Sequence, residues 1–215
     1  MTTLKEAQEA GKVSVKNGKM PGSTFAISAK HCNVGGKLAD LEGSVCHKCY
    51  ALKLQSFRPT VNAGWTGNLD KATRMIQADP ARWVAYITFQ INKAFEKTGE
   101  PFHRWFDSGD LQSVEMLDAI CAVARATPHI MHWLPTRETK IVKDYTGAAP
   151  DNLIVRISSP MVDDKPISGW YWTSTVHKTT EPVGHVCPAR HQGNACGSCR
   201  ACWSRNVPNI SYPLH

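Results

Sequence analysis

The chain has 215 residues, of which 42% are hydrophobic and 20% are charged, and it carries 15 glycines and 13 prolines. This composition is that of a globular protein and excludes disordered and collagen-like chains. Lysine and arginine outnumber aspartate and glutamate by 25 to 18, and the resulting net charge of +7 favours a polyanionic partner such as nucleic acid.

The length is enough for one sizeable core but not for two ordinary domains and a linker, so we expect a single domain over 1–215. Within it we expect a cysteine loop region over 1–65, a core of strands and helices over 66–165, and a cysteine-rich lobe over 166–215. The segment 1–18 is polar and charged, without the apolar run of a signal peptide or a membrane span. We therefore expect a cytoplasmic protein with no membrane partner.

Predicted strands and helices alternate along the chain, beginning with a short strand over 24–28. Residues 80–97 predict a helix, because Pro80 suits the first helical position, apolar residues recur at helical spacing and Gly99 follows the end. The pattern then predicts a strand over 102–107, a helix over 113–126, a strand over 129–134, a helix over 138–145 and a strand over 153–158. Strands that alternate with helices form a parallel sheet, so the predicted fold class is α/β.

Seven of the eight cysteines fall into two groups. The first group is Cys32, Cys46 and Cys49, and the second is Cys187, Cys196, Cys199 and Cys202. A reducing cytoplasm disfavours structural disulfides, and a Cys-x2-Cys pair brings two thiolates to one tetrahedral centre. Both groups are therefore predicted metal ligands, whereas Cys121 lies on an apolar helix face and is expected in the core.

The second group supplies four sulfurs, enough for a structural zinc site or a four-iron cluster, and its spacing does not separate the two metals. His191 and His215 are possible substitute ligands, and a reactive cluster without metal is the alternative. The first group has only three sulfurs, which leaves a fourth position open for a substrate or a cofactor. The alternative there is a structural zinc completed by His31 or His47.

Polar loops follow the predicted strands, over 107–110, 135–138 and 158–160. Ligands of parallel sheets bind at the carboxyl ends of the strands, so these loops are expected to converge on one cleft. The candidate residues there are Asp107, Asp110, Arg137 and Ser159. The alternative is that the first loop is only a turn and Thr136 only a helix cap.

Four segments resemble the phage gene-product-88 family, namely 19–23, 43–51, 104–110 and 199–203. The resemblance spans most of the chain and implies a bacteriophage source.

The early Cys-x2-Cys-Tyr loop and the Gly-acid motif after a strand are also similar to radical S-adenosylmethionine enzymes, which are partial (β/α) barrels. The family's usual motif places its first two cysteines much closer together than Cys32 and Cys46. The resemblance implies that the first cysteine group holds a four-iron cluster and that S-adenosylmethionine occupies the open position. It further implies that Ser108, Gly109 and Asp110 hold the amino group of this cofactor and that Ser158 and Ser159 face its ribose.

A rival resemblance links 107–113 and 134–137 to guanine transglycosylases, which carry a zinc held by three cysteines and one histidine. It implies that Asp107 handles a base, that Asp163 or Asp164 is the nucleophile, and that a deazaguanine is inserted into DNA.

We therefore expect a partial or small (β/α) barrel with a cysteine-rich, metal-binding C-terminal lobe. The predicted function is an iron–sulfur enzyme that modifies nucleic acid, namely DNA, by a radical mechanism, with Asp107, Asp110 and Arg137 as catalytic residues. The alternatives are a DNA guanine transglycosylase with structural zinc, and a non-catalytic zinc protein that binds DNA or a host factor.

Overall fold

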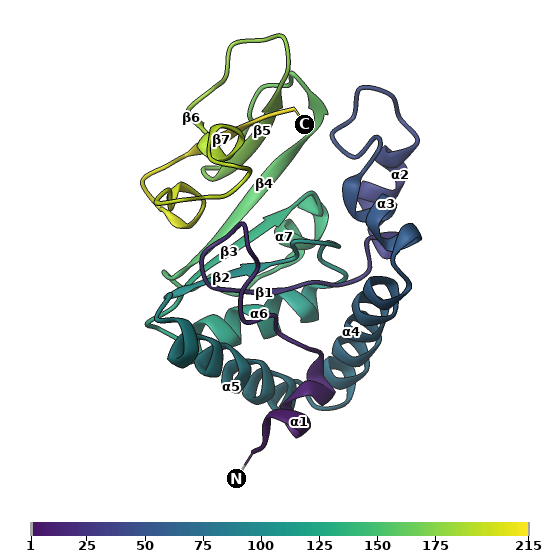
Figure 1. The fold of residues 1–215 in the computed structure, drawn as a ribbon, viewed down its shortest axis with the longest axis vertical. Helices are drawn as coiled ribbons and strands as arrows, with labels where there is room; N and C mark the ends of the chain where they lie inside the picture. Colours follow the sequence, from purple (N-terminus) through teal and green to yellow (C-terminus); the bar gives the residue numbers. More distant parts are fainter. Residues whose placement is uncertain (1, 215) are drawn as a thin grey trace.

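The fold is built around a seven-stranded parallel sheet (Figure 1), which a computed structural model describes over residues 2–214. The strand order is β1-β2-β3-β4-β5-β7-β6. The strands are β1 (Ser23–Phe25), β2 (Phe102–Trp105), β3 (Met131–Thr136), β4 (Leu153–Val162), β5 (Thr173–His177), β6 (His185–Val186) and β7 (Asn209–Pro213). Every pair of neighbours is parallel, so all seven carboxyl ends lie at one edge.

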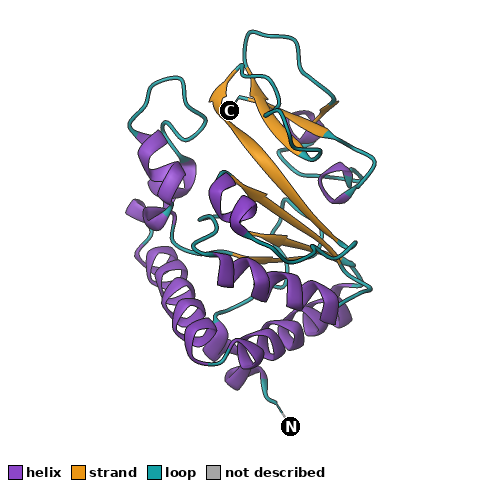
Figure 2. Cartoon of the chain, turned by 180° about the vertical axis from the view of Figure 1, so that it is seen from behind, coloured by secondary structure: helices purple, strands orange, loops and turns teal. Residues whose placement is uncertain are grey.

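The helices gather beside the β1–β3 part of the sheet, while loops surround most of the β5–β7 part (Figure 2). They are α1 (Leu4–Ala7), α2 (Asn33–Ala39), α3 (Tyr50–Phe57), α4 (Pro59–Ala78), α5 (Pro80–Thr98), α6 (Val114–Ala126) and α7 (Thr139–Asp144). None of the helices described in 2–214 has the length and apolar character needed to cross a bilayer.

The predicted α/β class with a parallel sheet is confirmed. The finer prediction of a barrel is not: within 2–214, β1 and β6 are the two edges of an open sheet and do not pair with each other. Strands β1 to β5 follow one another in sequence order, as the strands of a partial barrel also do. The α/β sheet is therefore established, and the partial barrel stays a prediction.

Helix α5 shows why the sequence pattern located the helices well. The Asp79 side chain accepts a hydrogen bond from the Arg82 amide at 3.0 Å, and Gly99 ends the helix at a φ of 70°. Trp83 is buried on the inner face of α5 and stacks on Trp105 of β2, with ring centroids 6.1 Å apart. In the same way Ser113 caps α6, as predicted. Burial of these apolar faces holds the helices against the sheet.

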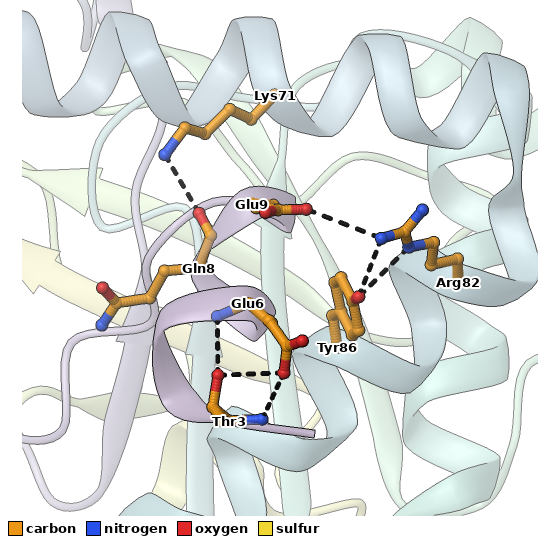
Figure 3. Close-up of polar contacts among 7 residues, drawn as sticks. All are labelled: Thr3, Glu6, Gln8, Glu9, Lys71, Arg82 and Tyr86. Carbon is orange, nitrogen blue, oxygen red and sulfur yellow. Dashed lines mark hydrogen bonds and ion pairs between the residues drawn. The ribbon is translucent and has the colours of Figure 1, made fainter. Parts of the chain in front are cut away.

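The N-terminal segment closes the helical side of this core (Figure 3). Thr3 and Glu6 form a reciprocal capping box at α1, and Lys71 of α4 donates a hydrogen bond to the Gln8 carbonyl at 3.0 Å. Arg82 lies 3.6 Å from the Glu9 carboxylate and also donates to the Tyr86 hydroxyl. The contacts of Gln8 and Glu9 join the turn Gln8–Ala10, which follows α1, to α4 and α5.

Two histidines lie in the sheet core and face the helices. The Ser23 hydroxyl lies 2.8 Å from Nδ1 of His103, and the Thr127 hydroxyl lies 2.8 Å from Nε2 of His132. Burial lowers the pKa of His103 well below its usual range and lowers the pKa of His132 to about 3. Both imidazoles are therefore neutral in the folded protein at neutral pH.

The opposite face of the sheet carries the cysteine-rich segment. Trp133 of β3 packs edge-on against Trp203, with ring centroids 5.2 Å apart. The fully buried guanidinium of Arg156 on β4 donates to main-chain carbonyls of Thr173, Ala201, Cys202, Ser204, Val207 and Pro208. One arginine thus holds the cysteine-rich segment to the sheet, and among residues 2–214 it has no acidic partner.

Candidate functional site

The loops after β1, β2 and β3 are joined by hydrogen bonds at the carboxyl edge of the sheet. The Ile27 amide donates to the Ser108 carbonyl at 3.0 Å, which joins the loop after β1 to the loop after β2. The Val34 amide donates to the Glu138 carboxylate at 2.9 Å, which joins the cysteine loop to the loop after β3. The structure therefore brings together the three loops that carry most of the predicted site.

The three cysteines of the first group lie beside these loops. A Cβ atom on Gly35 would lie 3.2 Å from Cβ of Cys32 and 3.5 Å from Sγ of Cys46, so the two cysteines pack around this glycine. Burial, together with the charges of Asp110, Cys49 and Cys46, raises the pKa of Cys32 to about 12. Burial also raises the pKa of Cys46, while the Arg137 guanidinium lowers it. The thiols and both charged groups are close enough to influence one another.

All eight cysteines are free thiols. Among residues 2–214 no group of three or more histidine, cysteine, aspartate or glutamate side chains is arranged to hold a metal ion. The ligand sets expected from the sequence therefore stay predictions.

Asp110 is buried, and both of its carboxylate oxygens already accept hydrogen bonds from the protein. Oδ1 accepts from the Leu111 amide at 2.8 Å, and Oδ2 accepts from the Arg137 amide at 2.9 Å. Burial raises the pKa of Asp110 to about 6, against the effect of hydrogen bonds from Thr136, Arg137 and Leu111. Asp110 is therefore placed to position the loop after β3.

Four buried polar atoms at this edge have no hydrogen-bond partner within the described part of the chain. They are Nε of Arg104, Oδ1 of Asp107, Oγ of Ser108 and Nε of Arg137. The other atoms of this kind lie in α5 or on β2 and β3: Thr88, Asn92, His103, Trp105, His132 and Trp133. An unpaired buried polar group costs about 1–3 kcal/mol, so native proteins usually supply it with a partner. Two acceptors and two donors together indicate a ligand site.

The close approach of two loops requires a glycine at position 109. Its φ is 85°, and a Cβ atom there would lie 2.3 Å from Cγ1 of Ile27. Only glycine allows the loop after β2 to approach the chain after β1 so closely. Next to this loop, the Tyr50 hydroxyl donates to the Asp107 carbonyl and connects the start of α3 to the site.

Ser158 and Ser159, in the second half of β4, have hydrogen-bond partners within the protein. Oγ of Ser158 accepts from the Ser174 hydroxyl at 2.9 Å, and the Ser159 hydroxyl donates to the Lys165 carbonyl at 2.9 Å. Their predicted contact with a ribose stays a prediction.

The two aspartates proposed as nucleophiles by the transglycosylase resemblance lie in the turn after β4. The Asp163 carboxylate accepts hydrogen bonds from the amides of Lys178, Thr179 and Thr180. That of Asp164 accepts from the Met161 amide at 3.3 Å. Neither carboxylate has a hydrogen bond that joins it to the loop of Asp107.

The second cysteine group lies beside β6 and β7, away from the loops after β1, β2 and β3. Sγ of Cys199 lies 3.5 Å from Nε2 of His185, and Sγ of Cys202 lies 3.3 Å from the Tyr212 hydroxyl. Burial raises the pKa of Cys202, to about 12, and also the pKa of Cys187 and Cys196. Residue 215, whose histidine was a possible ligand, lies outside the described residues.

Sequence reasoning missed His185 and Arg104 as candidate site residues. His185 lies on a two-residue edge strand that no periodicity indicates. Arg104 had a signal: it alternates with two buried residues, His103 and Trp105, on β2, so it had to face the other side of the sheet. There its guanidinium lies 4.5 Å from the centre of the Trp133 ring.

A sequence model described as gene product 88 matches residues 2–205. No curated protein and no solved structure matches the chain. The radical S-adenosylmethionine and transglycosylase resemblances therefore rest on short motifs alone.

Proposed function

This chain belongs to the gene product 88 family of phage proteins, and we propose that it is a metalloenzyme that modifies nucleic acid, with DNA as its substrate. The proposed mechanism resembles that of radical S-adenosylmethionine enzymes, with an iron–sulfur cluster at Cys32, Cys46 and Cys49. One observation supports the proposal: three of the four unpartnered polar atoms, on Asp107, Ser108 and Arg137, lie on the loops that the thiols adjoin, and the fourth, Nε of Arg104, lies near the end of β2.

These four atoms fit the amino-acid end of S-adenosylmethionine, which carries one ammonium and one carboxylate. Asp107 Oδ1 and Ser108 Oγ can accept hydrogen bonds from the ammonium, and Nε of Arg137 can donate one to the carboxylate. Nε of Arg104 is a second donor at the same edge. A ligand with both charges satisfies donors and acceptors together, which a simple anion or cation does not.

The number of thiols in the first group supports the proposed cluster, because three cysteine ligands leave one metal position open. A cluster held by Cys32, Cys46 and Cys49 would supply the electron for reductive cleavage of S-adenosylmethionine. The chain's own residues orient the cofactor. Asp110 holds the main chain of Arg137, and the Arg137 guanidinium favours the thiolate form of Cys46. The net charge of +7 supports nucleic acid as the substrate.

Binding of S-adenosylmethionine to anaerobically purified protein tests the proposal. Wild type should bind it, and Ser108→Ala should bind about tenfold more weakly, the value of one hydrogen bond to a charged group. Ser56→Ala is the matched control, since this exposed serine of α3 bonds only to its own helix, at the Leu52 carbonyl. A wild type that holds iron and binds no S-adenosylmethionine would contradict the proposal, and equal binding by Ser108→Ala would remove the cofactor from this loop.

One observation favours a second candidate, a non-catalytic zinc protein. Zinc accepts sulfur and nitrogen ligands together, and Cys199 contacts His185. Zinc without iron in the purified protein would favour this candidate.

A further inference from the structure

A cavity of about 720 Å³ opens where β5, β6 and β7 end. β5 ends at His177, β6 ends at Val186 and β7 ends at Pro213, and all three residues line the cavity. Lys178, Arg190 and His191 complete its polar lining. This cavity is separate from the loops after β1, β2 and β3.

The lining is basic and contains no acidic residue. Lys178, Arg190 and His191 are exposed, and none of them takes part in an ion pair within 2–214. The Asp163 carboxylate accepts hydrogen bonds from the main-chain amides of Lys178, Thr179 and Thr180, and it does not line the cavity. The cavity therefore offers positive charge that no described side chain neutralises.

The shape of the sheet relates this cavity to the candidate site. Because every strand is parallel, the carboxyl ends of β5, β6 and β7 lie at the same edge as those of β2 and β3. From β3 to β7 the order passes through β4 and β5, so the strand ends are separated by about 14 Å at roughly 4.8 Å per strand. One nucleic-acid strand carries about four phosphates over that length.

We propose that this cavity binds backbone phosphates of the nucleic-acid strand whose neighbouring nucleotide enters the candidate site. The inference rests on the proposed function for its choice of nucleic acid. No phenylalanine, tyrosine or tryptophan lines the cavity, so it suits phosphate contacts better than base stacking. Binding there is expected to be independent of base sequence.

The test uses the full chain with a fluorescent single-stranded oligothymidylate, and anisotropy is measured over a series of salt concentrations. The variant Lys178→Gln/Arg190→Gln removes two cavity charges. Lys93→Gln/Lys97→Gln is the matched control, because these exposed lysines of α5 carry the same charge on the helical side. The cavity variant should bind more weakly at low salt, and its slope of log affinity against log salt should be less steep by about 1.4.

The control should keep the wild-type affinity and slope, and equal melting temperatures should show that both variants fold. Equal binding by the cavity variant and the wild type would overturn the inference, as would a wild type that does not bind the oligonucleotide at low salt. An inorganic phosphate titration is the second arm: displacement of the oligonucleotide by low phosphate concentrations would assign the cavity to small anions instead. The assay needs neither iron nor cofactor. The oligonucleotide binding result can therefore be interpreted even if the proposed radical mechanism is wrong.

Discussion

The Asp110 carboxylate accepts a hydrogen bond of 2.9 Å from the main-chain amide of Arg137. This bond ties the loop after β2 to the loop after β3 and fixes the start of the segment whose side chain influences Cys46. The structure thus gives Asp110 a positioning role, and its predicted contact with a ligand stays a prediction.

Changing Asp110→Asn should lower the free energy of unfolding by about 1–3 kcal/mol, because one of two buried amides loses its acceptor. Urea denaturation measures this effect. The same variant should also bind S-adenosylmethionine less tightly, through displacement of Arg137. Wild-type stability combined with lost cofactor binding would instead make Asp110 a direct ligand contact.

Gly109→Ala should destabilise the protein by about 2–3 kcal/mol, because its Cβ atom would meet Ile27 and its φ is positive. Gly64→Ala on α4 is the control. Its Cβ atom would meet nothing within 4 Å, and helix propensity predicts a gain of about 0.5–1 kcal/mol. Thermal or urea unfolding measures the stability of both variants. Equal changes in the free energy of unfolding would contradict the close approach at Gly109.

Arg156→Leu should destabilise the chain by about 3–5 kcal/mol, because the carbonyls it serves lose a charged donor in a buried place. The cysteine-rich segment should also become sensitive to protease. Arg205→Leu, which removes an exposed ion pair of 3.0 Å with Asp151, should cost about 1 kcal/mol or less. Unchanged protease resistance of Arg156→Leu would show that other contacts hold the segment.

The buried histidines predict an acid-sensitive fold. Their pKa values are lower in the folded than in the unfolded chain, so the unfolded chain takes up protons first as the pH falls below about 6.5. Stability is therefore complete above that pH and falls at lower pH; the contribution of His132 is lost down to about pH 3, at roughly 1.4 kcal/mol per pH unit. His132→Leu should make this fall shallower, whereas His191→Gln, at an exposed histidine far along the chain, should leave it unchanged. Parallel pH profiles for all three proteins would contradict this account.

The sequence pattern was enough to predict α5 and α6, because each has an apolar period and a clear cap, and the parallel strands β2, β3 and β4 that alternate with helices. It failed for β5 and β7, in which most of the buried residues are polar. Thr173, Thr175 and Asn209 are buried because they form hydrogen bonds across the strands, a pairing that only the folded sheet provides.

The candidate site shows the same division. Parallel-strand logic was enough to bring Asp107, Ser108 and Arg137 to one edge. It could not show that Asp110 is satisfied by main-chain amides or that His185 contacts Cys199, since both depend on segments far apart in sequence.

The central claim is that the two cysteine groups bind metal and that the first holds an iron–sulfur cluster. Iron, sulfide and zinc per chain, measured on anaerobically purified wild type, Cys46→Ser and Cys199→Ser, test it most directly. We predict that the wild-type protein is brown and absorbs visible light. Cys46→Ser should fold but lose the cluster iron. Cys199→Ser should unfold or aggregate, because structural metal binding is coupled to folding. A colourless wild type without iron and sulfide, or metal content and stability unchanged in both variants, would contradict the account.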